Sequence, residues 1–237
     1  MNKSFNTLAE FEFESLKKAA NYRNWIGQRF KASFEGASNV LEVGSGIGQF
    51  TQIIQQYAEG AAVTALEPEI QFHDELKISA PNAEHLNAYS SELVGHRSFD
   101  AIASVNVLEH IEDDIAELKN WHALLKPGGR VCLLVPAHPE IYASIDNLMG
   151  HYRRYTKRSM TDKIESAGLQ ITELYYFNFL GYWLWLLNFK VFKRKTIDAK
   201  NVAFFDRVLI HFSKIMDLIR LNAFKGQSLI CIARKPT

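Results

Sequence analysis

The sequence predicts an α/β fold, a sheet of mostly parallel strands covered by helices on both faces. Short runs such as Phe99 to Val105 are apolar at almost every position, as in strands that are buried on both faces. These runs alternate four times with helix-like stretches, which is the order of a parallel sheet with helical crossovers. The first run, Val40 to Val43, leads into the alternate glycines Gly44, Gly46 and Gly48, which predicts a tight turn before a helix.

The other elements follow from periodicity and from turn residues. Apolar residues at three- and four-residue steps predict helix from Phe5 to Phe34, although Gly27 leaves open whether this is one helix or two. Right-handed crossovers place the carboxyl ends of parallel strands on one edge of the sheet, where ligands bind. We expect later strands over residues 62–66, 84–88, 99–105, 130–135, 168–176 and 228–233, and helices over residues 50–57, 69–79, 113–125, 160–167 and 202–221.

Composition and charge limit the class of function. The 237 residues are 47% hydrophobic, enough for a full core, and the formal net charge of +1 gives no overall attraction to nucleic acid. Cys132 and Cys231 lie in apolar runs without metal-binding spacing, so we expect buried, reduced thiols in a cytosolic protein. No uncharged apolar stretch reaches the ~18 residues of a membrane-spanning helix.

Two carboxylates accompany the glycine turn. Glu67 lies 19 residues after Gly48, at the expected end of the second strand, where an acidic side chain can bind ribose hydroxyls. Glu42 lies two residues before the first glycine, and a carboxylate there suits a cationic ligand better than a pyrophosphate. The glycine spacing also differs from the G-x-G-x-x-G pattern of dinucleotide-binding proteins.

Three motifs now carry a resemblance to a known family. The stretch Glu42-Val43-Gly44-Ser45-Gly46-Ile47-Gly48 resembles the first motif of class I S-adenosylmethionine-dependent methyltransferases. Residues 99–111 (FDAIASVNVLEHI) resemble the motif after their fourth strand, and residues 124–129 (LLKPGG) resemble the turn before their fifth. Together the motifs cover about residues 20–176 plus a final strand, and they are most similar to the small-molecule branch that includes quinone-biosynthesis O-methyltransferases.

The resemblance implies a Rossmann-like three-layer sandwich with a seven-stranded sheet, whose last strand is antiparallel and lies between the fifth and sixth. We expect a single methyltransferase domain over residues 1–237. Its parts would be an N-terminal helical cap (1–36), a cofactor-binding core (37–176), a helical insert (177–226) and a final strand (227–237). Cys132 and Cys231 would then lie on neighbouring strands, and Cα atoms more than ~7 Å apart would exclude a disulfide.

The resemblance also implies the cofactor, S-adenosylmethionine, with S-adenosylhomocysteine as the product. The glycine loop would bind the methionine half with Glu42 near its ammonium group, while Glu67 would bind the ribose and Pro68 would shape the adenine pocket. The cofactor-binding residues that we expect are Tyr22, Trp25, Glu42, Gly44, Ser45, Gly46, Gly48, Glu67, Pro68, Tyr89, Ser90, Asn106, Val107 and Leu108.

Some of these roles carry alternatives. Tyr22 and Trp25 would cap the cofactor, although core packing explains Trp25 equally well. Tyr89 or Ser90 would lie near the adenine edge, where many relatives have an Asp that this chain lacks.

The chemistry of methyl transfer indicates which further residues to look for. Transfer from a sulfonium is an in-line displacement, and some acceptors need a base to remove a proton. His110, His138 and His151 are candidate bases near the sheet edge, and His110 is best placed by topology, although packing over the cofactor is common for it in this branch. Arg153 and Arg154 could bind a carboxylate or phosphate, with one of the two expected in a surface ion pair. We expect catalytic roles for His110, His151 and Arg153, and no bound metal.

The insert between the last two strands is aromatic and basic. From Phe189 to Lys225 the local charge is +6, which indicates either a solvated face or a negatively charged partner. Residues 202–221 place Asp206, Asp217 and several basic residues on one side and apolar residues opposite, as in an amphipathic helix. Three interpretations stay open: packing or a cap over the acceptor pocket, which we favour, a dimer contact, or contact with a membrane surface.

We therefore expect S-adenosylmethionine-dependent methyl transfer to a small or lipid-like acceptor, with O-methylation favoured. The alternatives are an NAD-dependent Rossmann oxidoreductase and a non-catalytic, cofactor-binding adaptor at a membrane or protein. Nucleic acid is not expected as a partner, because Asn106-Val107-Leu108-Glu109 replaces the Pro-Pro-aromatic run of base methyltransferases and neither cysteine lies at a strand end. We expect a cytoplasmic location, with peripheral membrane contact and oligomer formation left open.

Overall fold

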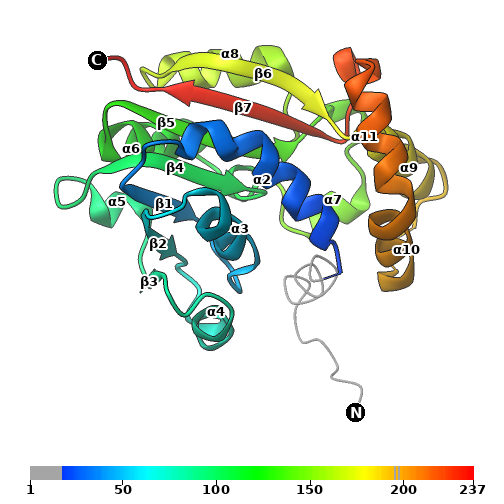
Figure 1. The fold of residues 1–237 in the computed structure, drawn as a ribbon. Helices are drawn as coiled ribbons and strands as arrows, with labels where there is room; N and C mark the ends of the chain where they lie inside the picture. The colour runs from blue at the N-terminus through cyan, green and yellow to red at the C-terminus, as the bar shows by residue number, and fades with distance from the viewer. Residues whose placement is uncertain (1–17, 195, 197) are drawn as a thin grey trace.

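The computed structural model describes residues 18–194, 196 and 198–237 of the chain. Its strands form one sheet in the order β3-β2-β1-β4-β5-β7-β6 (Figure 1). Strands β1 to β5 pair in parallel, whereas β7 is antiparallel to both of its neighbours, β5 and β6. The expected Rossmann-like fold, with an antiparallel last strand between the fifth and sixth, is confirmed.

All seven strands overlap the predicted ranges. They are β1 Asn39–Val43, β2 Ala62–Leu66, β3 Glu84–Leu86, β4 Phe99–Val105, β5 Leu125–Pro136, β6 Gln170–Phe177 and β7 Ser228–Arg234. β5 begins at Leu125 rather than at Arg130. Leu125 already pairs with Phe99 of β4, ahead of an irregularity in the register. The Pro-Gly-Gly segment that follows is hydrogen-bonded to the end of the chain, where Gly128 N–H donates to Lys235 O and Lys235 N–H donates to Gly129 O.

The helices among the described residues surround this sheet. The α-helices are α2 Ala20–Phe34, α3 Gln49–Tyr57, α4 His73–Ser79, α5 Ser90–Leu93, α6 Asp114–Leu124, α7 Ser144–Leu148, α8 Lys157–Ser166, α9 Phe179–Trp185, α10 Ala199–Phe204 and α11 Ile210–Leu218. Short 3-10 turns are η1 Ile70–Phe72, η2 Leu108–His110, η3 Pro139–Ile141 and η6 Leu221–Ala223, and π-helical turns are η4 Leu186–Val191 and η5 Phe205–Leu209. The predicted helix before residue 18 lies outside the described residues.

Two apolar layers, one on each face of the sheet, form the core. On one face, Trp121 of α6 and Met160 of α8 pack in a buried cluster with the side chains of β4, β5 and β7. On the other, Phe30 of α2 and Ile54 of α3 pack in a second cluster, which also takes in Ile210 of α11. The fold is therefore a three-layer sandwich, in which helices cover both faces of the sheet, as the apolar strands predict.

Gly27 does not interrupt α2, which is one helix from Ala20 to Phe34. A Cβ atom at Gly27 would lie 2.3 Å from a methyl carbon of Ile53 and within 3 Å of the Tyr57 ring. The glycine therefore allows close packing of α2 on α3, which offsets its weak intrinsic helix preference.

The two cysteines lie on neighbouring strands but face opposite ways. In the register of β5 and β7, Leu133 pairs with Cys231 and Cys132 pairs with Ile232. An offset of one residue places the side chains on opposite faces of a sheet, and the thiols belong to different core clusters. Both are free and buried, and burial raises the pKa of each thiol to about 12.

The C-terminal insert stands at the edge of the sheet where β6 ends, with α9, α10 and α11 beside one another (Figure 1). Residues from Ala199 to Leu218 continue as one helical rod through the π turn η5, close to the predicted 202–221. No helix among the described residues is long and apolar enough to cross a membrane.

This rod packs against the protein largely through its polar face, which is not the core-facing arrangement usual for an amphipathic helix. Asp206, Ser213 and Asp217 are buried against the rest of the protein. Ile210 is buried as well, and Phe205 and Leu209 are partly buried, but the other large apolar side chains on this rod include five that are exposed: Phe204, Val208, Phe212, Ile215 and Leu218. The acids turn inward because they accept hydrogen bonds from backbone N–H groups of the rest of the protein. Asp206 accepts from the N–H groups of Asn21 and Tyr22, and Asp217 accepts from those of Asn178 and Phe179.

Candidate functional site

The glycine loop between β1 and α3 has the backbone that its sequence predicts. Gly44, Gly46 and Gly48 have φ angles of 74°, 52° and 83°, a region that side chains with a Cβ rarely adopt. A Cβ at Gly44 would lie 2.3 Å from a methyl carbon of Val107, the second residue after β4. The loop therefore lies in direct contact with the segment that follows β4. Because the glycines carry no side chain, the backbone of the loop is what a ligand would meet.

Glu67 connects the end of β2 to this loop. It is buried, its Oε2 accepts a hydrogen bond of 2.7 Å from Gly46 N–H, and its Oε1 accepts one of 3.0 Å from Glu69 N–H. Burial raises the pKa of the carboxyl, and the two backbone donors oppose that shift. Asn87, which sequence reasoning missed, donates to the carbonyl oxygens of Glu67 and Pro68 and so fixes the end of β2.

Glu42 is buried at the base of the loop. Its Oε2 accepts a hydrogen bond from the hydroxyl of Thr51, a residue of α3 that the sequence did not single out. Burial raises the pKa of Glu42 to about 8, and the Thr51 hydrogen bond opposes the shift only in part. A cationic group placed beside this carboxyl would favour its ionised form, so the site has the polarity that an amino-acid ammonium requires.

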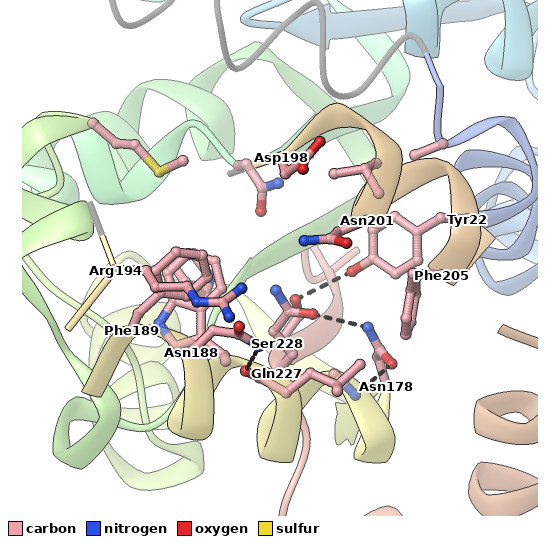
Figure 2. A pocket seen from close by; sticks show the side chains of 18 of the residues that line it. Tyr22, Asn178, Asn188, Phe189, Arg194, Asp198, Asn201, Phe205, Gln227 and Ser228 are labelled. Atoms are coloured by element: carbon pink, nitrogen blue, oxygen red, sulfur yellow. Dashed lines mark hydrogen bonds between the residues drawn. The ribbon is translucent and has the colours of Figure 1, made fainter. Parts of the chain in front are cut away.

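Two cavities adjoin at Tyr22 and Asn106. The smaller holds about 60 Å³ and is lined by Glu42, Gly44 and Ser45. The larger holds about 760 Å³ and opens beneath the insert (Figure 2). Tyr22 and Asn106 line both, and Asn106 has a φ of 53°, a backbone conformation that only glycine and a few polar residues adopt readily.

Four other predicted cofactor residues line neither of these two cavities. Trp25 is buried in the core, with its ring centroid 4.0 Å from that of Phe177. Of the two roles considered for Trp25, the structure shows core packing. Tyr89 is exposed beside α5, and the Ser90 hydroxyl donates to Glu117. Leu108 is fully buried in the core, where only its backbone could face a ligand.

The larger cavity contains a buried hydrogen-bonded group. His151 lines the cavity, and its Nδ1 lies 3.1 Å from Oδ1 of Asp146, which is fully buried. Arg154, also buried, places Nε 2.7 Å from the same carboxylate oxygen. Burial alone would raise the pKa of Asp146, but the His151 hydrogen bond and the Arg154 charge hold it below its usual value. Asp146 is therefore ionised and fixes the orientation of the His151 ring.

His110 lies behind His151 rather than on the cavity wall. The ring centroids are 4.7 Å apart and nearly perpendicular. Burial, and then the neighbouring His151, lower the pKa of His110 to about 4, so its imidazole is neutral near pH 7. Ligand atoms of Glu109, His110 and His151 lie within 4.8 Å of one another, the one such group among residues 18–194, 196 and 198–237. Two imidazoles and a carboxylate are a donor set that suits a divalent cation.

The structure does not bring Arg153 to either cavity. Its guanidinium pairs with Asp114 at 2.7 Å and donates to the carbonyl oxygens of Ile111 and Glu112. Arg154 occupies the position in the cavity that was expected for one of the two arginines, with its Cζ 4.5 Å from the centre of the Trp185 ring.

The insert provides the far wall of the larger cavity. Both π turns contribute, with Asn188 and Phe189 from η4 and Phe205 and Leu209 from η5. Figure 2 shows Asn188 and Phe189 across the cavity from Tyr22, with Phe205 beside Tyr22. Below them, Asn178 donates a hydrogen bond to Gln227, and the hydroxyl groups of Tyr22 and Ser228 lie 3.4 Å apart. The wall is mainly aromatic and aliphatic with a few polar groups, which suits a small acceptor with an apolar body.

Sequence reasoning missed the residues that hold these groups in place. Asp146 was not singled out, although it is one of only two acids between Pro136 and Thr156, a stretch that also holds His151 and Arg154. That acid beside a histidine and an arginine was the available signal. Nothing in the local sequence marked Thr51 as the partner of Glu42.

The fold and the paired cavities are typical of one class of protein. These are Rossmann-like proteins whose first glycine turn suits a ligand with a nucleoside at one end and an amino acid at the other. A model of the methyltransferase domain family matches residues 14–174. The chain belongs to this family, within the class I S-adenosylmethionine-dependent methyltransferases. S-adenosylmethionine is the cofactor of that class.

A curated relative gives a narrower similarity. The ubiquinone biosynthesis O-methyltransferase of Pseudomonas paraeruginosa is 30% identical over 143 residues, which is 56% of this chain and 59% of that protein. The protein of the same name from Ruegeria pomeroyi is 29% identical over 109 residues, 44% of each chain. The chain thus spans about half the length of these relatives.

Solved structures share the fold at low identity. The 1,6-didemethyltoxoflavin-N1-methyltransferase of Burkholderia thailandensis, solved with S-adenosylhomocysteine, gives a TM-score of 0.60 at 19% identity and covers 93% of this chain and 80% of its own. The [4+2]-cyclase SpnF gives a TM-score of 0.60 at 16% identity and covers 89% of this chain and 81% of its own. One fold thus serves both a methyltransferase and a cyclase, so the reaction must be argued from the site.

Proposed function

We propose that this protein transfers the methyl group of S-adenosylmethionine to a hydroxyl oxygen of a small, largely apolar acceptor. The observation that supports this is the junction of the two cavities at Tyr22 and Asn106. A donor held by the glycine loop and Glu42 would meet an acceptor beside His151 at that junction. An oxygen acceptor is favoured because two relatives are named O-methyltransferases.

In this mechanism the donor supplies an electrophilic methyl carbon on a positively charged sulfur. An acceptor oxygen held beside His151 would form a bond to that carbon as its bond to sulfur breaks, with S-adenosylhomocysteine as the leaving group. The acceptor proton passes to Nε2 of His151, because Asp146 holds the proton of the same ring on Nδ1. Glu42 would hold the ammonium of the donor and Glu67 its ribose, and the apolar wall of the insert would exclude water.

Calorimetric titration with S-adenosylmethionine, S-adenosylhomocysteine and NAD tests the donor. We expect both sulfur ligands to bind and NAD not to bind. Binding of NAD without binding of S-adenosylmethionine would favour an oxidoreductase and overturn the proposal.

Incubation of the protein with methyl-labelled donor and cell extract tests transfer. Mass spectrometry of the labelled product is expected to place the methyl group on oxygen. If the protein binds the donor but transfers label to no component of the extract, it would be a cofactor-binding adaptor. A label on nitrogen or carbon would contradict the proposal that the acceptor atom is oxygen.

A further inference from the structure

The outer side of the insert is an unusually apolar part of the surface. Of the 17 exposed large apolar side chains among the described residues, 12 lie between Trp183 and Phe224, a small fraction of the chain. We call these 12 residues the apolar surface: Trp183, Leu187, Val191, Phe192, Phe204, Val208, Phe212, Ile215, Leu218, Ile219, Leu221 and Phe224. Phe224 is 83% exposed and Leu218 is 77% exposed, so neither is covered by the rest of the protein.

The spacing along the chain collects these residues into stripes. Phe204, Val208 and Phe212 follow one another at four-residue steps, and Ile215 and Ile219 continue the same stripe. Phe204 stands at the rim, because it also lines the larger cavity. Trp183, Leu187 and Val191 repeat at the same step on the adjoining helix, α9 with its π turn η4. Residues three and four apart lie on one side of a helix, so the apolar surface is organised rather than scattered. Organised apolar patches of this kind mark interaction sites.

Charged groups around the apolar surface are almost all positive. The exposed cations of this segment are Lys190, Lys193, Arg194, Lys200, Arg207 and Arg220, of which Arg194 also lines the larger cavity. Asp198 is the one exposed acid among its described residues, because Asp206 and Asp217 are buried by hydrogen bonds to backbone N–H groups. The inverted helix therefore presents apolar and basic groups together and hides its acids.

We propose that the apolar surface docks on the face of a membrane that carries anionic lipids. Aromatic and aliphatic side chains would enter the boundary between headgroups and acyl chains, and the surrounding Lys and Arg would pair with lipid phosphates. A second copy of this chain fits the charges poorly, because a symmetric contact would bring the six exposed cations of each copy together. The docked helices lie on the membrane rather than across it.

Vesicle co-sedimentation tests this with the full chain. The probes are vesicles of phosphatidylcholine alone and vesicles that contain about a third phosphatidylglycerol. We expect binding to the anionic vesicles, weaker binding to the neutral ones, and a decrease with added salt because exposed charges are screened. No binding to anionic vesicles at physiological salt would overturn the proposal.

A pair of matched double variants locates the contact. Phe212→Ser with Leu218→Ser is expected to weaken vesicle binding about tenfold or more. Ile70→Ser with Ile78→Ser removes side chains of similar exposure, 69% and 80%, elsewhere on the protein and is expected to leave binding unchanged. Both pairs remove exposed side chains, so circular dichroism should show folded protein in each case. Equal losses in the two variants would overturn the assignment to the insert.

A second pair tests the charge. Lys200→Gln with Arg207→Gln is expected to weaken binding to anionic vesicles and to reduce its salt dependence, whereas Lys31→Gln with Lys119→Gln, the same loss of charge, is expected to do neither. Light scattering on the same proteins tests the rival occupant. Suppose that the wild-type protein is a dimer, that Phe212→Ser with Leu218→Ser abolishes this dimer, and that no vesicle binding is found. This result would overturn the proposal of membrane docking and assign the apolar surface to a second copy of the chain.

Discussion

The donor side and the acceptor side of the site are built by different means. On the proposed donor side, backbone conformation shapes most of the site: three glycines have positive φ, and the Glu67 carboxylate is held by N–H groups of the loop and of Glu69. On the acceptor side, the wall consists of side chains from an insert whose helices contain π turns. A site made by backbone tolerates little change in sequence, whereas a wall of side chains can be altered to take another acceptor without touching the donor site.

The largest expected effect separates the two sides at the acceptor. His151→Gln keeps a hydrogen-bonding side chain but removes the base, so kcat is expected to fall about 10²- to 10⁴-fold. The affinity for S-adenosylmethionine, measured by calorimetry, should stay the same because His151 lines only the larger cavity. A loss of donor affinity would show that the two sides are not separable.

Two controls accompany this variant. His110→Gln is expected to have a smaller effect, because His110 touches His151 but not the cavity. Treatment of the wild-type enzyme with a chelator should leave kcat unchanged if His151 acts as the base. Loss of activity on chelation, restored by a divalent cation, would instead assign Glu109, His110 and His151 to a metal.

The next effect tests whether the donor side depends on backbone. Gly44→Ala adds a Cβ that would meet Val107 at 2.3 Å, and relief of that contact must shift the loop. We expect donor affinity to fall about 5- to 150-fold, which corresponds to the ~1–3 kcal/mol that overpacking costs. Gly60→Ala is the matched control, since its φ is also strongly positive but nothing lies within 4 Å of the added atom. If both variants bind the donor alike, close packing is not what the glycine provides.

The pH dependence of donor binding reports on Glu42. Because burial raises its pKa to about 8, the carboxyl of the empty site is protonated at pH 6 and 7 and must ionise to pair with an ammonium. Donor affinity is therefore expected to rise about tenfold between pH 6 and pH 7 in calorimetric titrations. Glu42→Gln should bind more weakly and show no such rise. A flat profile in the wild-type protein would contradict a role for Glu42 at the ammonium.

The same carboxyl affects stability in the opposite sense. An acid whose pKa is higher in the folded than in the unfolded protein makes folding less favourable as pH rises from about 4.5 to 8. We compare the unfolding free energies of Glu42→Gln and the wild-type protein, both without ligand. As the pH rises over that range, the wild-type protein should become less stable relative to the variant. Denaturant titrations at several pH values measure it.

The smallest expected effect concerns the inverted helix. Asp206→Asn keeps the size of the side chain but replaces one of two acceptor oxygens, which face Asn21 N–H and Tyr22 N–H, with a donor. The free energy of unfolding should fall by ~1–3 kcal/mol. Asp198→Asn, at an exposed helix N-cap where Asn is equally suited, should change little. Equal effects would mean that burial of Asp206 contributes nothing specific.

The difference between the two sides also explains what the sequence could predict. The donor side is encoded locally: a β-strand, three glycines and an acid 19 residues later identify it, and the structure places Glu42, Gly44 and Asn106 around one small cavity. The strand pattern was sufficient for the sheet as well, because strands buried on both faces are apolar throughout.

The acceptor side depends on contacts between distant segments. Periodicity showed that residues 202–221 have two faces but not which face turns inward. The inward face was decided by N–H groups at the start of α2 and of α9, partners far away in the chain. In the same way, Arg153 and Arg154 are adjacent and chemically alike, and only the position of Asp146 determines which of them reaches the cavity.

The hydrogen bonds of Asp206 have one more consequence. They join the helix that carries the apolar surface to the backbone of Tyr22, and Tyr22 lines both cavities. Any ligand that binds one position of this helix better than another therefore also changes the energy of the residue where donor and acceptor meet. Such coupling is reciprocal, so occupancy of the cavities and occupancy of the outer surface would alter each other's affinity by the same factor.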